Sequence, residues 1–147
     1  MILVQHILET ARERLAVLSP EASLCEAATI LANPNTPLAL VCNSEGALVG
    51  VIARGDIVRV LAGGAEAVGL NAGAIMTNVV LSCHVDQTLQ QVWDVMSART
   101  LRCAPILDEH GKPQGVVHAR DVAKALLGEV TEEEGLLRDY VLGVGYQ

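Results

Sequence analysis

The sequence predicts an α/β fold in which two copies of one α-β-β-α unit pack against each other as a pseudo-twofold pair. Three observations predict this fold: a composition able to form a core, an internal repeat without gaps, and the same order of helix and strand patterns in both copies. The 147 residues suffice for one ordinary domain, or for two small modules that share a core. We therefore expect one domain made of two repeats.

The composition supports a core of small, branched side chains. Hydrophobic residues make up 51% of the chain, with no Phe, one Trp and two Tyr, which excludes disorder for most of its length. Ten Lys and Arg stand against seventeen Asp and Glu, for a net charge of −7. An acidic chain with few aromatic rings offers little to phosphates or bases, so nucleic acid is not an expected partner.

The sequence shows no targeting or membrane pattern. The first fifteen residues carry charges and lack an apolar signal-peptide core, and charged residues interrupt every long apolar stretch. We expect a cytoplasmic protein that does not enter a membrane. Four cysteines without CxxC spacing favour reduced thiols over a zinc ribbon or a disulfide framework: Cys25, Cys42, Cys83 and Cys103.

The internal repeat has an offset of 65 residues. Gly50–Val58 aligns with Gly115–Ala123, and the same offset holds without a gap in both directions. Further matched pairs are Gly46 with Gly111, Ala39 with Ala104, Leu24 with Leu89, and Leu61 with Leu126. Two copies of one structural unit are present.

Each unit begins with a short strand and an amphipathic helix. We expect the strand near Val17 in the first copy and near Val80 in the second. Apolar residues at i, i+3, i+4 and i+7 predict helices that start at Leu24 and Leu89. Ser23 and Thr88 directly precede them and are natural N-caps.

A β-hairpin and a second helix complete each unit. Apolar runs on both sides of a polar, glycine-containing turn predict hairpins. The expected strands are Leu38–Cys42 with Leu48–Ile52, and Cys103–Leu107 with Gly115–Val117. Glycines close the helices that follow, which we expect over about Asp56–Leu61 and Asp121–Leu127.

The expected domain organisation has four parts. Residues 1–16 contain an N-terminal helix over about Val4–Leu15, and residues 17–64 form the first repeat. Residues 65–128 form the linker and the second repeat. Residues 129–147 hold an acidic helix over about Glu132–Leu142 and a tail.

This duplicated pattern resembles the tandem CBS domain pair, also called a Bateman module. The resemblance rests on the repeated order Gly, two aliphatics, a small polar position, two variable residues, Asp and an aliphatic, placed between hairpin and helix. Ala74–Thr77 and Val4–Leu8 look like the usual openings of the two repeats. The resemblance implies a regulatory module that binds AMP, ADP, ATP or a related adenosyl compound in clefts between the repeats. It also implies homodimers. An unknown effector protein is a further expected partner.

The motif aspartates, Asp56 and Asp121, are the first candidate ligand residues. The resemblance implies contacts with the ribose hydroxyls, and a carboxylate in the first turn of a helix after a strand can accept such hydrogen bonds. Each Asp can instead simply cap its helix. Arg54 and Arg120 lie beside the motif, where they can reach phosphates or remain surface charges.

Residues entering the first hairpin strand are candidates for the adenine slot, since small residues there leave an apolar space next to backbone donors and acceptors. They are Pro37, Leu38 and Ala39 in the first repeat, and Arg102, Cys103 and Ala104 in the second. Ordinary strand packing is the alternative explanation. Thr77 and Val80 are further candidates by position.

The chain departs from the family at the small polar position, where Ser or Thr usually meets phosphate. Ala53 and His118 stand there instead. We expect His118 to act as a cation toward phosphate below its ordinary pKa of about 6.5, whereas Ala53 supplies no donor. The alternative is that His118 turns to solvent or packs as a neutral side chain.

Three other functions compete with nucleotide sensing. No nucleophile and base stand in a catalytic pattern, so we expect no enzyme and no cofactor. A metal sensor would use Cys83, His84, Cys103 and His118, whose spacing matches no standard site. A ligand-free dimerisation or docking module is the third alternative.

Overall fold

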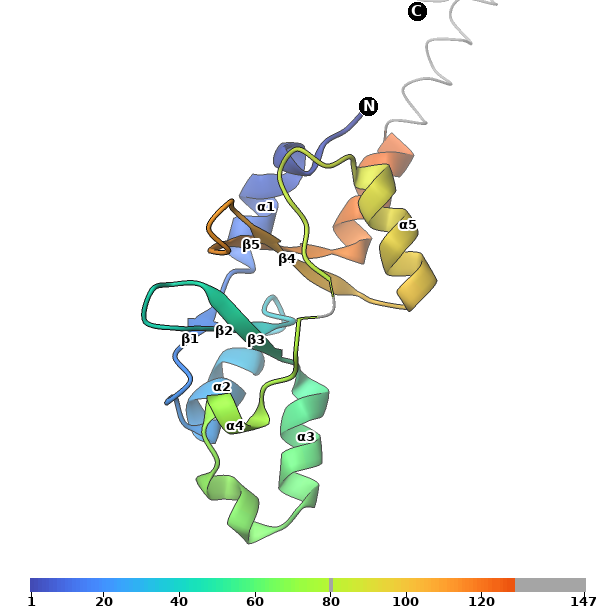
Figure 1. Ribbon diagram of the computed structural model, residues 1–147. Coiled ribbons are helices and arrows are strands. Elements are labelled where there is room, and N and C mark those ends of the chain that lie inside the picture. Colours follow the sequence, from blue (N-terminus) through green and yellow to red (C-terminus); the bar gives the residue numbers. More distant parts are fainter. Residues whose placement is uncertain (80, 129–147) are drawn as a thin grey trace, which may run out of the picture.

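The computed structural model describes residues 1–79 and 81–128, and it shows two lobes joined at their sheets (Figure 1). The first sheet has the order β1-β2-β3, with strands Val17–Leu18, Ala39–Cys42 and Leu48–Ile52. The second pairs β4 (Cys103–Leu107) with β5 (Pro113–His118). The sheets lie together in the middle, with helices toward the outer ends. The predicted α/β class and its pair of repeats are confirmed.

The helices that open each repeat begin at the expected caps. In α2 (Leu24–Leu31), Ser23 Oγ accepts a hydrogen bond from Glu26 N at 3.0 Å. In α5 (Leu89–Arg99), Thr88 Oγ1 accepts from Gln91 N at 3.1 Å, and Gln91 Oε1 accepts from Thr88 N at 3.0 Å. These reciprocal bonds satisfy backbone donors that the helix itself leaves unpaired.

The hairpin turns follow the same chemistry in both repeats. Asn43 Oδ1 accepts from two backbone N–H groups of its turn at 3.0 Å each, and Asp108 Oδ1 does the same at 2.8 and 2.9 Å. Gly46 (φ 85°) and Gly111 (φ 77°) take the left-handed conformation that these turns require. The second hairpin strand extends two residues further toward its turn than expected, because Leu107 pairs with Pro113.

The second helices are α3 (Arg54–Ala62) and a helical segment over residues 119–128. Both start two residues before the predicted Asp. In α3 the cause is that Asp56 Oδ2 accepts from Ala53 N at 2.8 Å, which makes Ala53 the N-cap residue.

The segment that opens each repeat, here called its arm (residues 4–14 and 72–79), packs into the core of the other repeat. The 3-10 helix η1 (Val4–Ile7) and α1 (Leu8–Glu13) pack into the core of the second repeat, whereas α4 (Ala72–Ile75) packs into the first. The motif glycines make these approaches possible. A Cβ on Gly115 would lie 2.8 Å from the carbonyl carbon of Ala11, and one on Gly50 would lie 2.4 Å from Met76 Sδ. Ala11 and Met76 are themselves 65 residues apart.

The remaining segments differ more from expectation. β1 pairs in parallel with β2, but its counterpart is a single bridge between Cys83 and Ile106. The linker contains a 3-10 helix, η2 (Ala65–Gly69), which the sequence did not predict. The predicted helix over Glu132–Leu142 and its tail lie outside the described residues. Over residues 1–79 and 81–128, no helix combines the length and apolar character needed to cross a membrane.

Candidate ligand-binding site

A cavity of about 370 Å³ lies where the two repeats meet. Equivalent positions of both repeats face it, since Pro37 corresponds to Arg102, Leu38 to Cys103 and Ala53 to His118. The cavity therefore straddles the pseudo-twofold axis. Seven of the predicted site residues line it, together with Gly55 and Leu101: Pro37, Leu38, Ala53, Arg54, Arg102, Cys103 and His118.

A smaller cavity of about 160 Å³ adjoins it and shares Leu38, Leu101 and Cys103. Its other lining residues are Val51, Thr77, Asn78, Val79, Leu81 and Pro105. The walls are mostly apolar, and the predicted Thr77 lies here. We call the smaller cavity the apolar lobe of the site, and the larger cavity, which Arg54 and Arg102 line, the charged lobe of the site.

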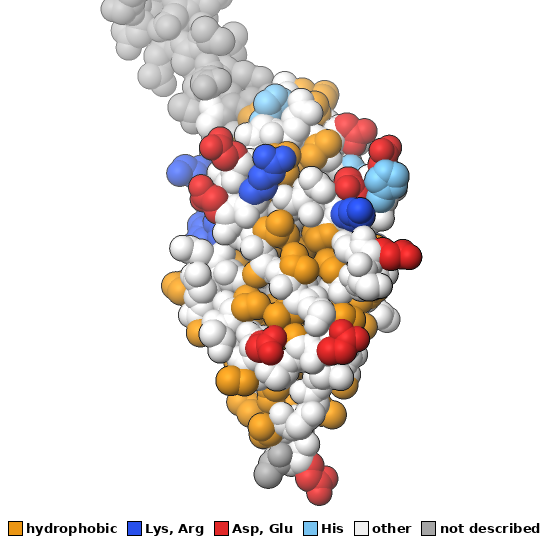
Figure 2. All heavy atoms as spheres, turned by 90° about the vertical axis from the view of Figure 1, so that its left-hand side faces the viewer, with side chains coloured by type: hydrophobic (Ala, Val, Ile, Leu, Met, Phe, Trp, Pro, Cys, Tyr) orange, Lys and Arg blue, Asp and Glu red, His pale blue; other side chains and the backbone are white. Residues whose placement is uncertain are grey.

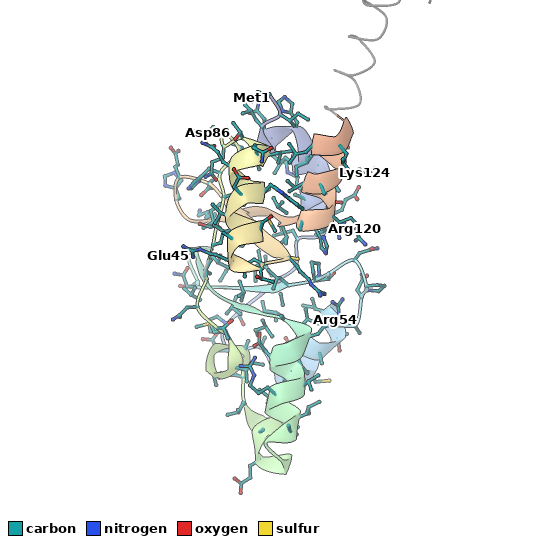
Figure 3. All side chains as sticks on the ribbon, turned by 90° about the vertical axis from the view of Figure 1, so that its right-hand side faces the viewer. Met1, Glu45, Arg54, Asp86, Arg120 and Lys124 are labelled. Carbon is teal, nitrogen blue, oxygen red and sulfur yellow. The ribbon has the colours of Figure 1, made fainter. Side chains whose placement is uncertain are left out.

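The two arginines of the larger cavity are held differently. Arg54 lies where the two halves of the molecule meet (Figure 3). It donates from Nε to Leu31 O at 2.7 Å, and from Nη2 to Asn33 O at 2.8 Å and to Thr36 O at 3.2 Å. Arg102 is exposed, and its side chain makes no hydrogen bond or ion pair with any residue in the described ranges. Arg102 is thus available to a ligand, whereas Arg54 supplies a fixed charge.

His118 caps the helix that follows it. Its Nδ1 accepts a hydrogen bond from Arg120 N at 3.0 Å, so the ring proton of the neutral form lies on Nε2. Burial, followed by the charges of Arg120 and Arg14, lowers the pKa of His118 below its ordinary value. The lowered pKa favours the neutral ring in the free protein, and the cationic role toward a bound phosphate stays a prediction. The neutral ring still has an N–H group to donate.

The two cysteines of the second repeat, Cys83 and Cys103, are shielded thiols. Burial raises the pKa of Cys103 to about 11 and that of Cys83 to about 12, so both are thiols at neutral pH. Cys83 Sγ donates to Pro105 O at 3.6 Å, and His84 Nδ1 lies 3.1 Å from Leu107 O. Within residues 1–79 and 81–128, no three His, Cys, Asp or Glu side chains come together as a metal site.

The two motif aspartates stand outside the cavity linings and have different partners. Asp56 accepts from Ala53 N through Oδ2 and from Arg59 Nη2 through Oδ1, the latter at 2.5 Å. Asp121 Oδ2 accepts from Arg14 Nε at 3.0 Å, and its Oδ1 from Arg14 Nη2 at 3.3 Å. The capping role is therefore observed for Asp56, and their contact with ribose remains a prediction.

The other predicted residues lie farther from the cavity. Ala39 and Ala104 are fully buried in the two cores. Arg120 is exposed at the start of the last helical segment (Figure 3), and Val80 lies outside the described residues. Sequence reasoning missed Leu101 and Gly55 in the lining, and also Arg14 and Arg59. Only Arg59 carried a signal, because its i+3 spacing from Asp56 suits an ion pair on a helix.

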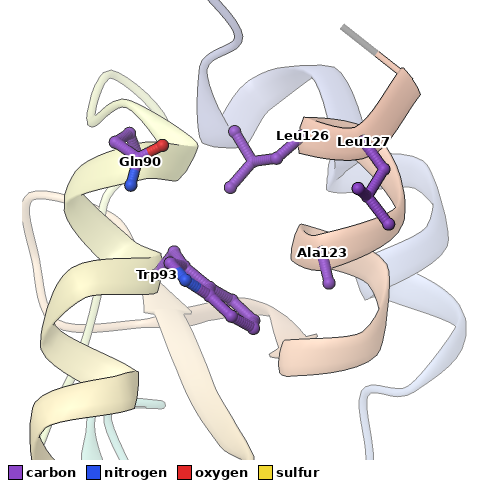
Figure 4. A pocket seen from close by; sticks show the side chains of 5 residues that line it. All are labelled: Gln90, Trp93, Ala123, Leu126 and Leu127. Carbon is purple, nitrogen blue, oxygen red and sulfur yellow. The ribbon is translucent and has the colours of Figure 1, made fainter. Parts of the chain in front are cut away.

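Two apolar grooves mark the outer helix faces. One of about 320 Å³ lies between α5 and residues 119–128, with Trp93 and Leu126 directed into it (Figure 4). The other, of about 230 Å³, lies between α2 and α3, where Ala28 and Val58 take the positions equivalent to Trp93 and Ala123. Figure 2 shows another face of the molecule, where most charged side chains lie over the lobe formed by α1 and the second repeat, and most exposed apolar ones lie below them.

Comparisons with known proteins agree with this architecture. The model of the CBS domain family matches residues 4–63 and 72–128. An uncharacterized 17.7 kDa protein of Acidianus ambivalens is 29% identical over 137 residues, which cover 93% of this chain and 82% of that protein. The L-aspartate semialdehyde sulfurtransferase of Methanocaldococcus jannaschii is 29% identical over 107 residues, which are 73% of this chain but only 20% of the enzyme.

Solved structures of CBS domain pairs have the same fold. The pair of protein MJ0100, in complex with 5′-methylthioadenosine and S-adenosyl-L-methionine, has a TM-score of 0.74 and 26% identity, and the match covers 88% of this chain and 98% of that one. CBSX2 in complex with AMP has a TM-score of 0.75 at 22% identity, and here the coverage is 87% and 98%. At 22% identity, the similarity to CBSX2 is evidence for a shared fold only.

Proposed function

Since the chain belongs to the CBS domain family, we propose that it is a regulatory module that binds an adenine nucleotide or a related adenosyl compound between its two repeats. The observation that carries this proposal is the cavity that gathers equivalent residues of both repeats. Its volume of about 370 Å³ lies within the usual range for small-molecule sites. The adenosyl ligands bound by the CBS pair of MJ0100 support the same ligand class.

The two lobes suit the two ends of a nucleotide. The apolar lobe offers adenine mostly aliphatic side chains beside the Thr77 hydroxyl, which donates a hydrogen bond to Val51 O at 3.3 Å. The charged lobe offers phosphate the free guanidinium of Arg102, the N–H of His118 Nε2 and the fixed charge of Arg54. No carboxylate is among the described residues of either lining. This charge favours a phosphorylated ligand over the sulfonium cation of S-adenosylmethionine.

Asp56 can still turn to a ribose. Its ion pair partner, Arg59, has a side chain that is 70% exposed, whereas the side chain of Asp56 itself is only 9% exposed. Arg59 can therefore return to solvent when a ligand replaces it, provided that the ligand supplies hydrogen bonds to the buried carboxylate. Vicinal hydroxyls can take the place of Arg59 as donors to Oδ1, while the hydrogen bond from Ala53 N to Oδ2 can remain.

The site favours binding over catalysis. Burial raises the pKa of Cys103 to about 11 and so keeps this lining residue in the thiol form, and the Thr77 hydroxyl donates a hydrogen bond to Val51 O. We therefore propose that occupancy is read by another protein. We also propose a homodimer joined at the apolar grooves of the outer helices, where Val58 is 65% and Leu127 66% exposed. Light scattering at tens of micromolar tests the dimer, and a monomer contradicts it.

The ligand proposal is tested by thermal unfolding with AMP, ADP, ATP, adenosine, 5′-methylthioadenosine and S-adenosylmethionine, with GMP as the base control. A ligand at one hundred times its dissociation constant should stabilise the fold by ~2.7 kcal/mol. Arg102→Gln should weaken AMP binding about tenfold, equivalent to about 1.4 kcal/mol, and leave adenosine binding unchanged. Lys124→Gln is the matched control, because it removes an exposed charge outside both cavities. No stabilisation by any compound would favour the ligand-free docking module.

A further inference from the structure

The arms that open the two repeats differ in length. α1 continues to Glu13 and packs along β5, whereas α4 ends at Ile75, three positions earlier in the repeat register. The sequence explains the difference, since Ala, Arg and Glu over residues 11–14 favour a helix more than Thr, Asn and Val over residues 77–79. After α4 the chain is extended, and Thr77 exchanges backbone hydrogen bonds of 3.0 and 2.9 Å with Val51.

Because the two arms differ in length, a cavity is present on one side of the pseudo-twofold axis, and side chains fill the equivalent space on the other side. On the side of α4, Val51, Val79 and Leu101 line the smaller cavity and are partly exposed. On the side of α1, the residues equivalent to Val51 and Leu101 are buried, with Val116 at 0% and Thr36 at 7% exposure.

Arg14 is the residue equivalent to Val79. Its guanidinium reaches across to the second motif carboxylate and holds it with two hydrogen bonds, and the side chains of Arg14 and Asp121 are only 12% and 18% exposed. A ligand that needed Asp121 would have to break a fork-to-fork pair that is largely shielded from water. Asp56 is also shielded, with 9% of its side chain exposed, but its partner Arg59 is 70% exposed and can move into solvent when a ligand binds.

We propose that Arg14 occupies the second site of the pair, so that each chain binds one ligand, on the side of Thr77 and Asp56. Asp121 then anchors Arg14 and does not hold ribose. The inference rests on the proposed function, because it concerns how many of the two equivalent positions between the repeats hold a ligand.

Calorimetric titration with AMP tests this proposal, and 5′-methylthioadenosine serves as titrant if AMP does not bind. The wild type should bind one ligand per chain, and Asp121→Asn should leave the affinity within about threefold. Arg14→Val introduces the residue found at the equivalent open position, and it should raise the stoichiometry toward two. The reverse change, Val79→Arg, should weaken binding at least tenfold because it fills the open cavity.

Several results would overturn the proposal. Two ligands per wild-type chain, a tenfold loss in Asp121→Asn, or unchanged binding in Val79→Arg would each contradict it. A folded Arg14→Val variant that still binds one ligand would show that Arg14 does not close the second site. If Arg14→Val does not fold, the wild-type stoichiometry and Val79→Arg remain decisive. Absence of binding to both titrants would overturn the proposed function as well, which separates that failure from the others.

Discussion

The two repeats carry the same aspartate in the same place and use it differently. In the first repeat Ala53 has no side-chain acceptor, and Asp56 accepts the hydrogen bond from its backbone N–H. In the second repeat His118 stands at the equivalent position, and its own ring caps the helix by accepting from Arg120 N. Asp121 is then engaged by a residue from the opposite arm, Arg14.

The difference teaches how a duplicated motif diverges. One substitution, at the residue three positions before the aspartate, decides whether the helix end is capped by a side chain at that position. The arms diverge in the same sense, since one places Val79 and the other Arg14 at the equivalent point. The structure thus has an open cavity on one side of the pseudo-twofold axis, where we propose that the ligand binds, and an internal ion pair on the other side.

The largest expected effect separates the two motif glycines. Gly115→Ala places a Cβ 2.8 to 3.0 Å from backbone atoms and the Cβ of Ala11, which belong to a packed helix and cannot easily move. Overpacking of this kind should cost about 2–3 kcal/mol. Gly50→Ala meets mainly the flexible side chain of Met76 and should cost about 1 kcal/mol. Urea unfolding measures the free energy of unfolding of both variants. Equal losses would show that the two arms pack equally tightly against their sheets.

The next effect compares the two aspartate ion pairs. Arg14→Ala leaves the largely shielded carboxylate of Asp121 without its partner and should destabilise the fold by about 1–3 kcal/mol, between the values for surface and fully buried pairs. Arg59→Ala removes a partner that is 70% exposed from a carboxylate that is 9% exposed and keeps its hydrogen bond from Ala53 N, so it should cost less, about 0.5–1 kcal/mol. Urea unfolding of Arg14→Ala, Asp121→Ala and the double variant isolates the coupling. A coupling no larger than that of Asp56 with Arg59 would refute the assignment of Arg14 as a structural anchor.

Features set by local chemistry could be predicted from the sequence. Ser23 and Thr88 cap their helices, and the hairpins turn at the expected glycines, because each depends on residues a few positions apart. The offset of 65 predicted the paired architecture. Half of the predicted site residues line one cavity. This also follows from the repeat, because equivalent strand ends meet at the pseudo-twofold axis.

Features that depend on distant contacts could not be predicted. Arg14 and Asp121 are 107 residues apart, and no local pattern joins them. The burial of Ala39 and Ala104 follows from side-chain alternation along strands that the exchanged arms cover, and the exchange itself was not predicted. The sign of the pKa shift of His118 depends on burial and on Arg120 and Arg14, which the spacing alone does not assemble.

The smallest expected effect concerns the histidine cap, which the first repeat lacks. The folded pKa of His118 lies below its unfolded value, so protons bind the unfolded chain first. The stability from this group is therefore fully present above the unfolded pKa of about 6.5, and it is lost as pH falls from there through the lower folded value. Because the ring is partly solvated, the loss should be less than about 1 kcal/mol. His118→Asn keeps a capping acceptor but does not titrate, so unfolding of both proteins between pH 5 and pH 8 isolates the effect. The wild type should lose stability relative to the variant as the pH falls, and parallel curves would mean that protonation leaves the cap intact.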